Sequence, residues 1–228
     1  MPEPTILALG GGGWLMEPEN PLLDDHLLAL TGKERPRIAL LPTGSADSTD
    51  VIARFYDSFV GKARPTHLPL FRRDRPVEVL LEQDAIYVSG GNTANLLAIW
   101  RVHGVDRVLR QCWERGVVLC GVSAGSLCWF QGGVTDSFGA ALDPLRDGLG
   151  FLPGSHCPHF DGEARRRPVY TALVAQGALP PGIAADDGAG LVYRGTTLAE
   201  VVLSRPAARA WRVGVEGPPE ALPGRFLG

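Results

Sequence analysis

An apolar strand runs directly into a glycine-flanked serine in the segment VVLCGVSAG, residues 117–125. The first five residues carry no polar side chain, which is typical of a strand covered on both faces of a parallel sheet. Gly121 and Gly125 permit a sharp turn between strand and helix, because neither brings a Cβ atom into it. The segment therefore predicts a strand, a tight turn that carries Ser123, and a helix.

The rest of the first half repeats this alternation. Four more runs predict strands: Thr5–Gly10, Arg37–Leu41, Pro65–Leu70 and Ala85–Ser89. Helical patterns lie between them, over about Thr49–Val60 and over Leu96–Arg115 with a break near Gly104. Strands alternating with helices predict a parallel sheet covered by helices on both sides. We therefore expect a single α/β domain built as a three-layer sandwich.

In such a sandwich, ligands bind beyond the carboxyl ends of the strands. Those ends carry glycine-rich or small residues at four places: Gly10–Gly13, Pro42–Ser45, Gly90–Thr93 and Ser123. Gly10–Gly13 lacks a clean G-x-G-x-x-G pattern, so it does not predict a dinucleotide site. We expect the four segments to border one crevice.

The second half of the chain is less regular. Gln131–Ser155 is rich in glycine and turn residues and predicts loops with short strands. Glu163–Gln176 predicts a helix, and Ile183–Tyr193 and Leu198–Leu203 predict strands.

Composition is ordinary for a globular domain. The chain has 228 residues, of which 45% are hydrophobic and 21% charged. Its formal net charge of −3 argues against a nucleic-acid or membrane-surface partner. The N-terminus, MPEPTILALGGGGW, lacks the features of a secretory signal, and no apolar run is long enough to cross a membrane, so we expect a cytoplasmic protein. We expect residues 1–213 to form the catalytic domain and residues 214–228 to be a Gly/Pro-rich tail.

The turn at Ser123 has the G-x-S-x-G pattern of a nucleophile elbow. Such a turn lifts the serine Oγ clear of the sheet, and the N–H of the next residue, Ala124, faces the position of a developing oxyanion. Gly90-Gly91-Asn92-Thr93 could supply a second N–H donor from a neighbouring strand end. The plain structural alternative is a serine that only caps a helix.

A nucleophilic serine needs a base, and His156 and His159 are the histidines that follow Ser123 in the chain. We expect His159, which follows a proline, to be the base and His156 to be a structural or surface histidine. His156, Cys157, His159 and Asp161 could suggest a metal cluster. However, a segment with Pro158 is not helical and does not bring both imidazoles together, so we expect no metal.

The base needs a carboxylate to orient it, and Asp186, Asp187 and Asp136 are the candidates. The resulting order, serine, histidine, acid, differs from the serine, acid, histidine order of α/β-hydrolases. This order argues against a lipase or esterase of that fold.

Four ordered motifs carry a resemblance to a known family: GGNT at 90–93, GVSAGS at 121–126, CPHF at 157–160 and DDG at 186–188. Over roughly residues 5–205 the chain resembles the peptidase E family, peptidase family S51, which includes aspartyl dipeptidases and cyanophycinases. The resemblance implies a fold related to class I glutamine amidotransferases, with a serine in place of the nucleophilic cysteine. It also implies short peptides as substrates, no cofactor, and compatibility with a homodimer.

Carried over residue by residue, the resemblance makes Ser123 the nucleophile and His159 the general base. It makes Gly91 and Ala124 the oxyanion-hole donors through their backbone N–H groups. Asp187 stands where peptidase E has a glutamate, one methylene longer.

The resemblance makes Asn92 and Arg165 the expected substrate-binding residues. The loop after His159 is shorter than in dipeptidase members, which argues against strict cleavage of Asp-X dipeptides. Three alternatives stay open: a homologue that binds acidic peptides without cleaving them, a cyanophycinase-like amide hydrolase, and a cysteine enzyme that uses Cys120 or Cys157.

Overall fold

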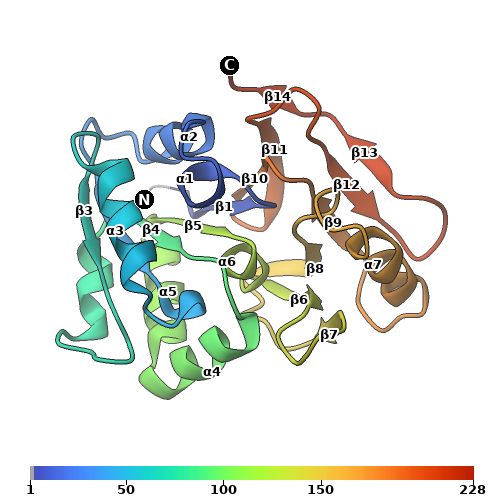
Figure 1. Cartoon of the computed structure of the whole chain (residues 1–228), viewed down its shortest axis with the longest axis horizontal. Helices are drawn as coiled ribbons and strands as arrows, with labels where there is room; N and C mark the ends of the chain where they lie inside the picture. Colours follow the sequence, from blue (N-terminus) through green and yellow to red (C-terminus); the bar gives the residue numbers. More distant parts are fainter. Residues whose placement is uncertain (1–2) are drawn as a thin grey trace.

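The computed structural model describes residues 3–228, where the strands form two sheets (Figure 1). The strands of the larger sheet are β1 (Thr5–Leu9), β2 (Arg37–Leu41), β3 (Arg64–His67), β4 (Ala85–Val88), β5 (Val118–Val122), β10 (Ala189–Arg194), β11 (Thr197–Leu203) and β14 (Arg225–Phe226). The strands of the smaller sheet are β6 (Phe130–Thr135), β7 (Asp143–Leu145), β8 (Leu152–Cys157), β9 (Gly182–Ala185), β12 (Ala210–Val213) and β13 (Glu220–Leu222).

Helical segments cover these sheets. They are α1 (Gly13–Met16), α2 (Leu22–Leu30), α3 (Thr49–Phe59), α4 (Thr93–His103), α5 (Val105–Glu114), α6 (Ala124–Leu127) and α7 (Arg166–Ala175), with two 3₁₀ turns, η1 (Thr43–Ser45) and η2 (Val77–Glu82). The predicted break between α4 and α5 is confirmed at Gly104, whose φ of 71° ends one helix and begins the next.

The larger sheet has the order β14-β11-β10-β1-β5-β4-β2-β3. Its five strands β1, β5, β4, β2 and β3 pair in parallel, which confirms the predicted parallel sheet. Antiparallel β10 and β11 extend it beyond β1. The carboxyl ends of the parallel strands therefore meet at one edge of the sheet.

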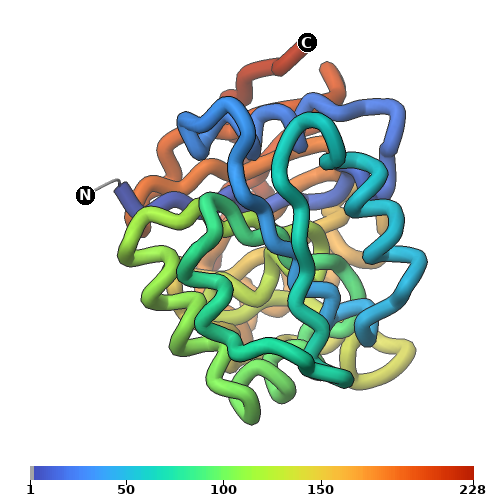
Figure 2. The backbone as a smooth tube through the Cα atoms, turned by 90° about the vertical axis from the view of Figure 1, so that its left-hand side faces the viewer, coloured from blue at the N-terminus to red at the C-terminus, as the bar shows by residue number. Residues whose placement is uncertain are grey.

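The central parallel strands β1, β5 and β4 are fully buried, whereas β3 at the edge of the sheet is partly exposed. Leu7 and Leu9 of β1 pack in one apolar cluster with side chains from α2 and α3, whereas Ile6 and Ala8 pack in a second with side chains from α4 and α5. Figure 2 shows α3 in cyan and α4 and α5 in green to yellow-green on opposite sides of the molecule. The predicted layering is thus confirmed.

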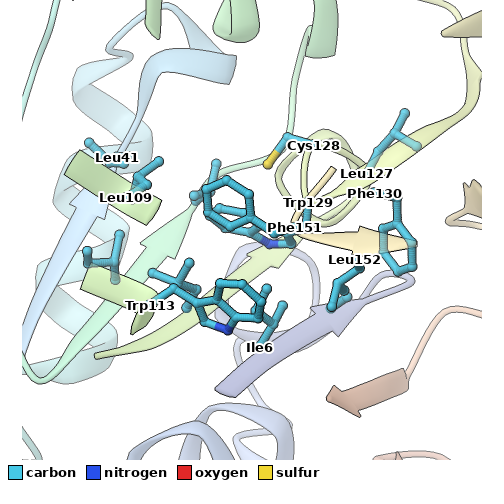
Figure 3. Packing of buried hydrophobic residues seen from close by; sticks show 14 of the residues in the cluster. Ile6, Leu41, Leu109, Trp113, Leu127, Cys128, Trp129, Phe130, Phe151 and Leu152 are labelled. Carbon is cyan, nitrogen blue, oxygen red and sulfur yellow. The ribbon is translucent and has the colours of Figure 1, made fainter. Parts of the chain in front are cut away.

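Aromatic rings join the second cluster to the smaller sheet. The ring of Phe151 stacks on Trp113 of α5 at 5.6 Å between centroids and lies 5.8 Å from the ring of Trp129 (Figure 3). Phe151 precedes β8 and Trp129 precedes β6, so this contact fixes the smaller sheet against one face of the larger one.

The smaller sheet has the order β13-β12-β9-β8-β6-β7. Its glycine-rich strands explain why the sequence predicted mainly loops here. A Cβ atom on Gly133 of β6 would lie 2.1 Å from the carbonyl oxygen of His156, so the glycine permits close pairing rather than a turn. Helix α7 covers this sheet, with Tyr170 and Val174 buried against it.

The predicted strand Ile183–Tyr193 is wrong as a single element. It is two strands, β9 in the smaller sheet and β10 in the larger one, separated by Asp186-Asp187-Gly188. Gly188 has a φ of 82°, which lets the chain turn from one sheet into the other.

Residues from 214 onward contribute a strand to each sheet, because β13 pairs with β12 and β14 pairs with β11. Within residues 3–228, none of the helices has the length and apolar character needed to span a bilayer.

Candidate active site

Ser123 lies in the turn between β5 and α6 with a φ of 57° and a ψ of −118°. A non-glycine residue with positive φ is held there by its surroundings at an energetic cost, and such residues cluster at functional sites. The flanking glycines are required by space: a Cβ on Gly121 would lie 2.0 Å from the carbonyl oxygen of Gly125, and one on Gly125 would lie 2.3 Å from that of Val88.

His159 follows the end of β8 in the smaller sheet and also has a positive φ, 54°. Its backbone N–H donates to the carbonyl oxygen of Gly10, at the carboxyl end of β1, over 3.2 Å. The side chain is directed at Asp187, with His159 Nδ1 and Asp187 Oδ1 2.6 Å apart. Asp187 itself lies where the chain crosses from β9 to β10.

The carboxylate of Asp187 lies between two glycines. A Cβ on Gly11 would be 2.0 Å from Asp187 Oδ1, and a Cβ on Gly162 would be 2.4 Å from Asp187 Oδ2. The backbone N–H of Asp187 donates to the Asp161 carboxylate over 2.8 Å. Glycine on both sides therefore leaves the carboxylate just enough room to face the imidazole.

Burial is the largest single influence and raises the pKa of the Asp187 carboxyl, but the hydrogen bond and charge of His159, with smaller contributions from Arg205 and Arg166, together lower it by more. The net pKa lies below the usual value, so Asp187 is ionised at neutral pH. An ionised carboxylate can only accept, which places a proton on Nδ1 of His159 and leaves Nε2 as the basic nitrogen.

Ser123, His159 and Asp187 share one cleft of about 560 Å³. The residues that line it are Leu15, Met16, Ser45, Gly90, Gly91, Ser123, His159, Gly162, Glu163 and Asp187. Another hollow, of about 310 Å³, lies at the amino ends of the strands near Lys33 and Asp84. The first cleft is at the carboxyl ends, where ligands bind in α/β sheets, and it combines a hydroxyl with an imidazole.

Two backbone segments border Ser123. The turn after β4 comes close to it, because a Cβ on Gly90 would lie 3.4 Å from Cβ of Ser123. The next residue, Gly91, lines the cleft with a φ of 126°. Ala124 is buried at the first position of α6, where backbone N–H groups have no partner within the helix.

The other candidate carboxylates are used elsewhere. Asp186 accepts hydrogen bonds from the backbone N–H of Arg209 and from Nε1 of Trp211, over 2.9 and 3.0 Å. These contacts join the end of β9 to β12. Asp136 is exposed in the loop after β6. Of the three, Asp187 is the one that contacts His159.

The structure does not bring Asn92 or Arg165 into the cleft lining. Asn92 caps α4: its Oδ1 accepts from the N–H of Asn95 over 2.8 Å, and its Nδ2 donates to the carbonyl of Ser137. The Arg165 guanidinium donates to the carbonyl of Ala140 over 3.0 Å and is exposed. Both contacts fix the loop after β6 beside the cleft.

His156 is fully buried and makes structural contacts. Its Nδ1 lies 2.8 Å from the carbonyl of Ile183, its Nε2 lies 3.1 Å from Oγ of Ser126, and its ring stacks on Phe130. Burial lowers its pKa to about 4, so the imidazole is neutral at physiological pH. His156 and His159 thus bind different partners.

The cysteines considered as nucleophiles are both buried and free. Burial raises the pKa of Cys120 and of Cys157 well above the usual value, so both remain thiols at neutral pH. A protonated, buried sulfur is a poor nucleophile. Neither lines the cleft.

Several cleft residues carried no chemical signal in the sequence. Leu15 and Met16 come from α1, and Ser45 comes from η1. The strand ends expected at the crevice included Ser45 in Pro42–Ser45, whereas Leu15 and Met16 lie just beyond Gly10–Gly13. Glu163, on the turn after His159, was not singled out at all.

Comparison with known proteins identifies relatives over most of the chain. Residues 6–201 match the sequence pattern of Peptidase family S51. The chain is 49% identical to the uncharacterised peptidase YgaJ of Bacillus subtilis (strain 168) over 211 residues, which is 91% of each chain. It is 28% identical to Peptidase E of Shewanella denitrificans over 138 residues, 57% of this chain and 58% of that protein.

A solved structure has the same fold. The crystal structure of a peptidase from an acI-B1 Actinobacterium superposes with a TM-score of 0.74, covering 97% of this chain and 95% of that one at 21% sequence identity.

Proposed function

The chain belongs to peptidase family S51, and from that premise we propose that it is a serine peptidase acting on short peptides through Ser123, His159 and Asp187. One observation carries the assignment of residues. The imidazole bound to Asp187 over 2.6 Å opens into the same cleft as a serine held at positive φ on a strand–helix turn.

The protonation states suit the base. Because Asp187 is ionised and binds Nδ1–H of His159, Nε2 carries the lone pair that takes the proton from Ser123 Oγ. The serine oxygen then attacks the scissile carbonyl carbon, and Nε2 returns the proton to the leaving amine. Water hydrolyses the resulting acyl-enzyme with His159 again as base, which regenerates Ser123.

The backbone supplies the oxyanion site in this proposal. The N–H groups of Gly91 and Ala124 belong to two different turns that flank Ser123. Each aligned donor contributes about 3 kcal/mol to the stability of the tetrahedral intermediate. Backbone donors on short turns cost little reorganisation during the reaction.

The test is labelling with a fluorophosphonate probe, followed by hydrolysis of a dipeptide panel. We expect labelling and turnover in the wild-type chain, and neither in Ser123→Ala. His159→Gln should also lose labelling, because an unactivated serine does not react. Ser58→Ala, on α3 outside the cleft, is the matched control and should behave as wild type.

A wild-type chain that neither labels nor cleaves would refute the proposal and favour a protein that binds peptides without turnover. Cleavage that survives Ser123→Ala would refute the assigned nucleophile. Activity lost after thiol alkylation but retained in Ser123→Ala would favour a cysteine enzyme.

A further inference from the structure

Glu163 is held at the cleft by the same turn that carries the histidine. Its backbone N–H donates to the carbonyl of His159 over 3.1 Å. Its side chain lines the cleft with Ser123 and remains 47% exposed. It is therefore a carboxylate beside the catalytic groups for which the chemistry proposed above has no use.

A buried arginine orients this carboxylate. Arg166 Nε and Nη2 donate to the two carboxylate oxygens of Glu163 over 2.8 and 3.3 Å, and Arg166 Nη1 donates to the carbonyl of Val134 over 2.9 Å. The arginine side chain is only 6% exposed, so it approaches Glu163 from inside the protein. Carboxylate oxygens accept more than one hydrogen bond each, which leaves the exposed side of Glu163 free to accept from a ligand.

Among the described residues, the side chains that line the cleft are either negatively charged or neutral. Within residues 3–228 its charged side chains are Glu163 and the ionised Asp187, and the lining contains no lysine or arginine. Leu15 and Met16 provide its apolar wall. Such a surface favours a bound cation and disfavours a substrate carboxylate.

Building on the proposed function, we propose that Glu163 binds the α-ammonium group of the substrate. The substrates are then short peptides with a free N-terminus whose first residue is not acidic. In every such peptide the α-ammonium group and the carbonyl carbon of the first peptide bond are attached to the same Cα atom. A carboxylate on the turn of the base is suited to hold that bond at Ser123. An aspartate in first position would bring a further carboxylate to a cleft whose lining already holds Glu163 and Asp187 and includes no lysine or arginine among the described residues.

The test compares Leu-Ala, N-acetyl-Leu-Ala, Asp-Ala and N-acetyl-Lys-Ala on wild type, Glu163→Gln and Glu114→Gln. Glu114 is an exposed residue of α5 outside the cleft and serves as the matched control. We expect wild type to cleave Leu-Ala with a kcat/KM about tenfold or more above that for the acetylated peptide and for Asp-Ala. Glu163→Gln should lose most of this preference, mainly by a raised KM for Leu-Ala.

Because glutamine can replace only part of the pairing with Arg166, thermal unfolding of each variant is measured as well. Equal losses on free and acetylated peptides would mean a structural role and overturn the inference. Glu163-dependent cleavage of N-acetyl-Lys-Ala would assign the carboxylate to a side-chain ammonium and overturn the N-terminal assignment. So would Asp-Ala as the preferred peptide, or no cleavage of any peptide.

The proposed function fails by a different result. If Ser123→Ala cleaves these peptides as wild type does, the triad is wrong whatever the preference. If cleavage depends on Ser123 but ignores the N-terminus, the triad stands and the role of Glu163 is wrong.

Discussion

Gly11→Ala should remove catalysis while leaving the fold in place. Gly11 has no positive φ, so its backbone conformation accepts alanine. The obstacle is the pair of catalytic side chains: the new Cβ would lie 2.0 Å from Asp187 Oδ1 and 2.9 Å from His159 Nδ1. A Cβ contact is ordinary only from about 3.4 Å outward, so the carboxylate oxygen must move by about 1.4 Å.

That displacement is incompatible with the present hydrogen bond. Starting from 2.6 Å, a shift of this size away from the imidazole takes the Nδ1–Oδ1 pair beyond hydrogen-bonding distance. His159 then loses its oriented tautomer, a defect that lowers kcat by about 10²–10⁴-fold in enzymes with this chemistry. Since a side chain rather than backbone gives way, we expect a stability loss of only about 1–3 kcal/mol.

The assay is kcat for a cleaved dipeptide together with thermal unfolding. Gly139→Ala is the control, because a Cβ there meets nothing within 4 Å. The double variant with Asp187→Asn should be no slower than Asp187→Asn alone, since both changes remove the same contact. A folded Gly11→Ala chain with wild-type kcat would refute the reasoning. If Gly11→Ala does not fold, Gly162→Ala tests the other side of the carboxylate.

Four further substitutions test the choice of acid, a buried carboxyl and the proposed oxyanion turn. Asp187→Asn should lower kcat about 10³–10⁴-fold. Asp186→Asn should mainly lower the melting temperature, because the Asp186 carboxylate binds β12. If kcat falls in Asp186→Asn and not in Asp187→Asn, the roles of the two residues are exchanged. Burial raises the pKa of Asp24 from 3.8 to about 7, so its proton is held more tightly in the folded state and stability falls as pH rises between these values. As pH rises from about 4 to about 8, the free energy of unfolding of Asp24→Asn, measured in urea, should therefore increase relative to that of wild type by at most about 4 kcal/mol. Unfolding free energies of the two proteins that change in parallel with pH would contradict this. Gly91 has a φ of 126°, and Gly91→Ala places a Cβ 1.9 Å from a backbone carbonyl oxygen. The substitution should lower the free energy of unfolding by about 3 kcal/mol and with it the melting temperature. An unchanged melting temperature would show that the turn adapts.

The parallel sheet was predictable because its signals are local. Each strand is a short apolar run that ends in small residues, and each helix between them shows a periodic apolar face. The smaller sheet gave no such signal. In β6 the glycines permit close backbone approach, and β9 continues towards β10 without a polar interruption long enough to separate two elements. Membership of different sheets is a tertiary property that periodicity cannot express.

The residues of the candidate site fall into the same two groups, those with a local sequence signal and those that depend on tertiary contacts. Ser123 and His159 were proposed from a turn pattern and from chain order, which depend on few neighbouring residues, and the structure places both at one cleft. The choice of Asp187 over Asp186 depends on which side chain faces the imidazole after the crossing into β10. The need for glycine at positions 11 and 162 depends on contacts with Asp187, which lies 176 and 25 residues away along the chain, and it becomes visible only when the side chains are in place.

The residues of the proposed triad come from both sheets, so their geometry depends on how the sheets are held together. Ser123 follows β5 of the larger sheet, and His159 follows β8 of the smaller one. Three residues from each of them, Ser126 and His156 meet across that seam at 3.1 Å. Because the carbonyl of Ile183 can only accept, the buried imidazole of His156 donates from Nδ1 and accepts at Nε2, where the single hydroxyl proton of Ser126 is shared between Nε2 and the carbonyl oxygen of Ser123. The same Oγ lies 2.8 Å from the carbonyl oxygen of Ser123. His156, which lies outside the proposed triad, thus fixes the strand before His159 against the helix that begins after Ser123.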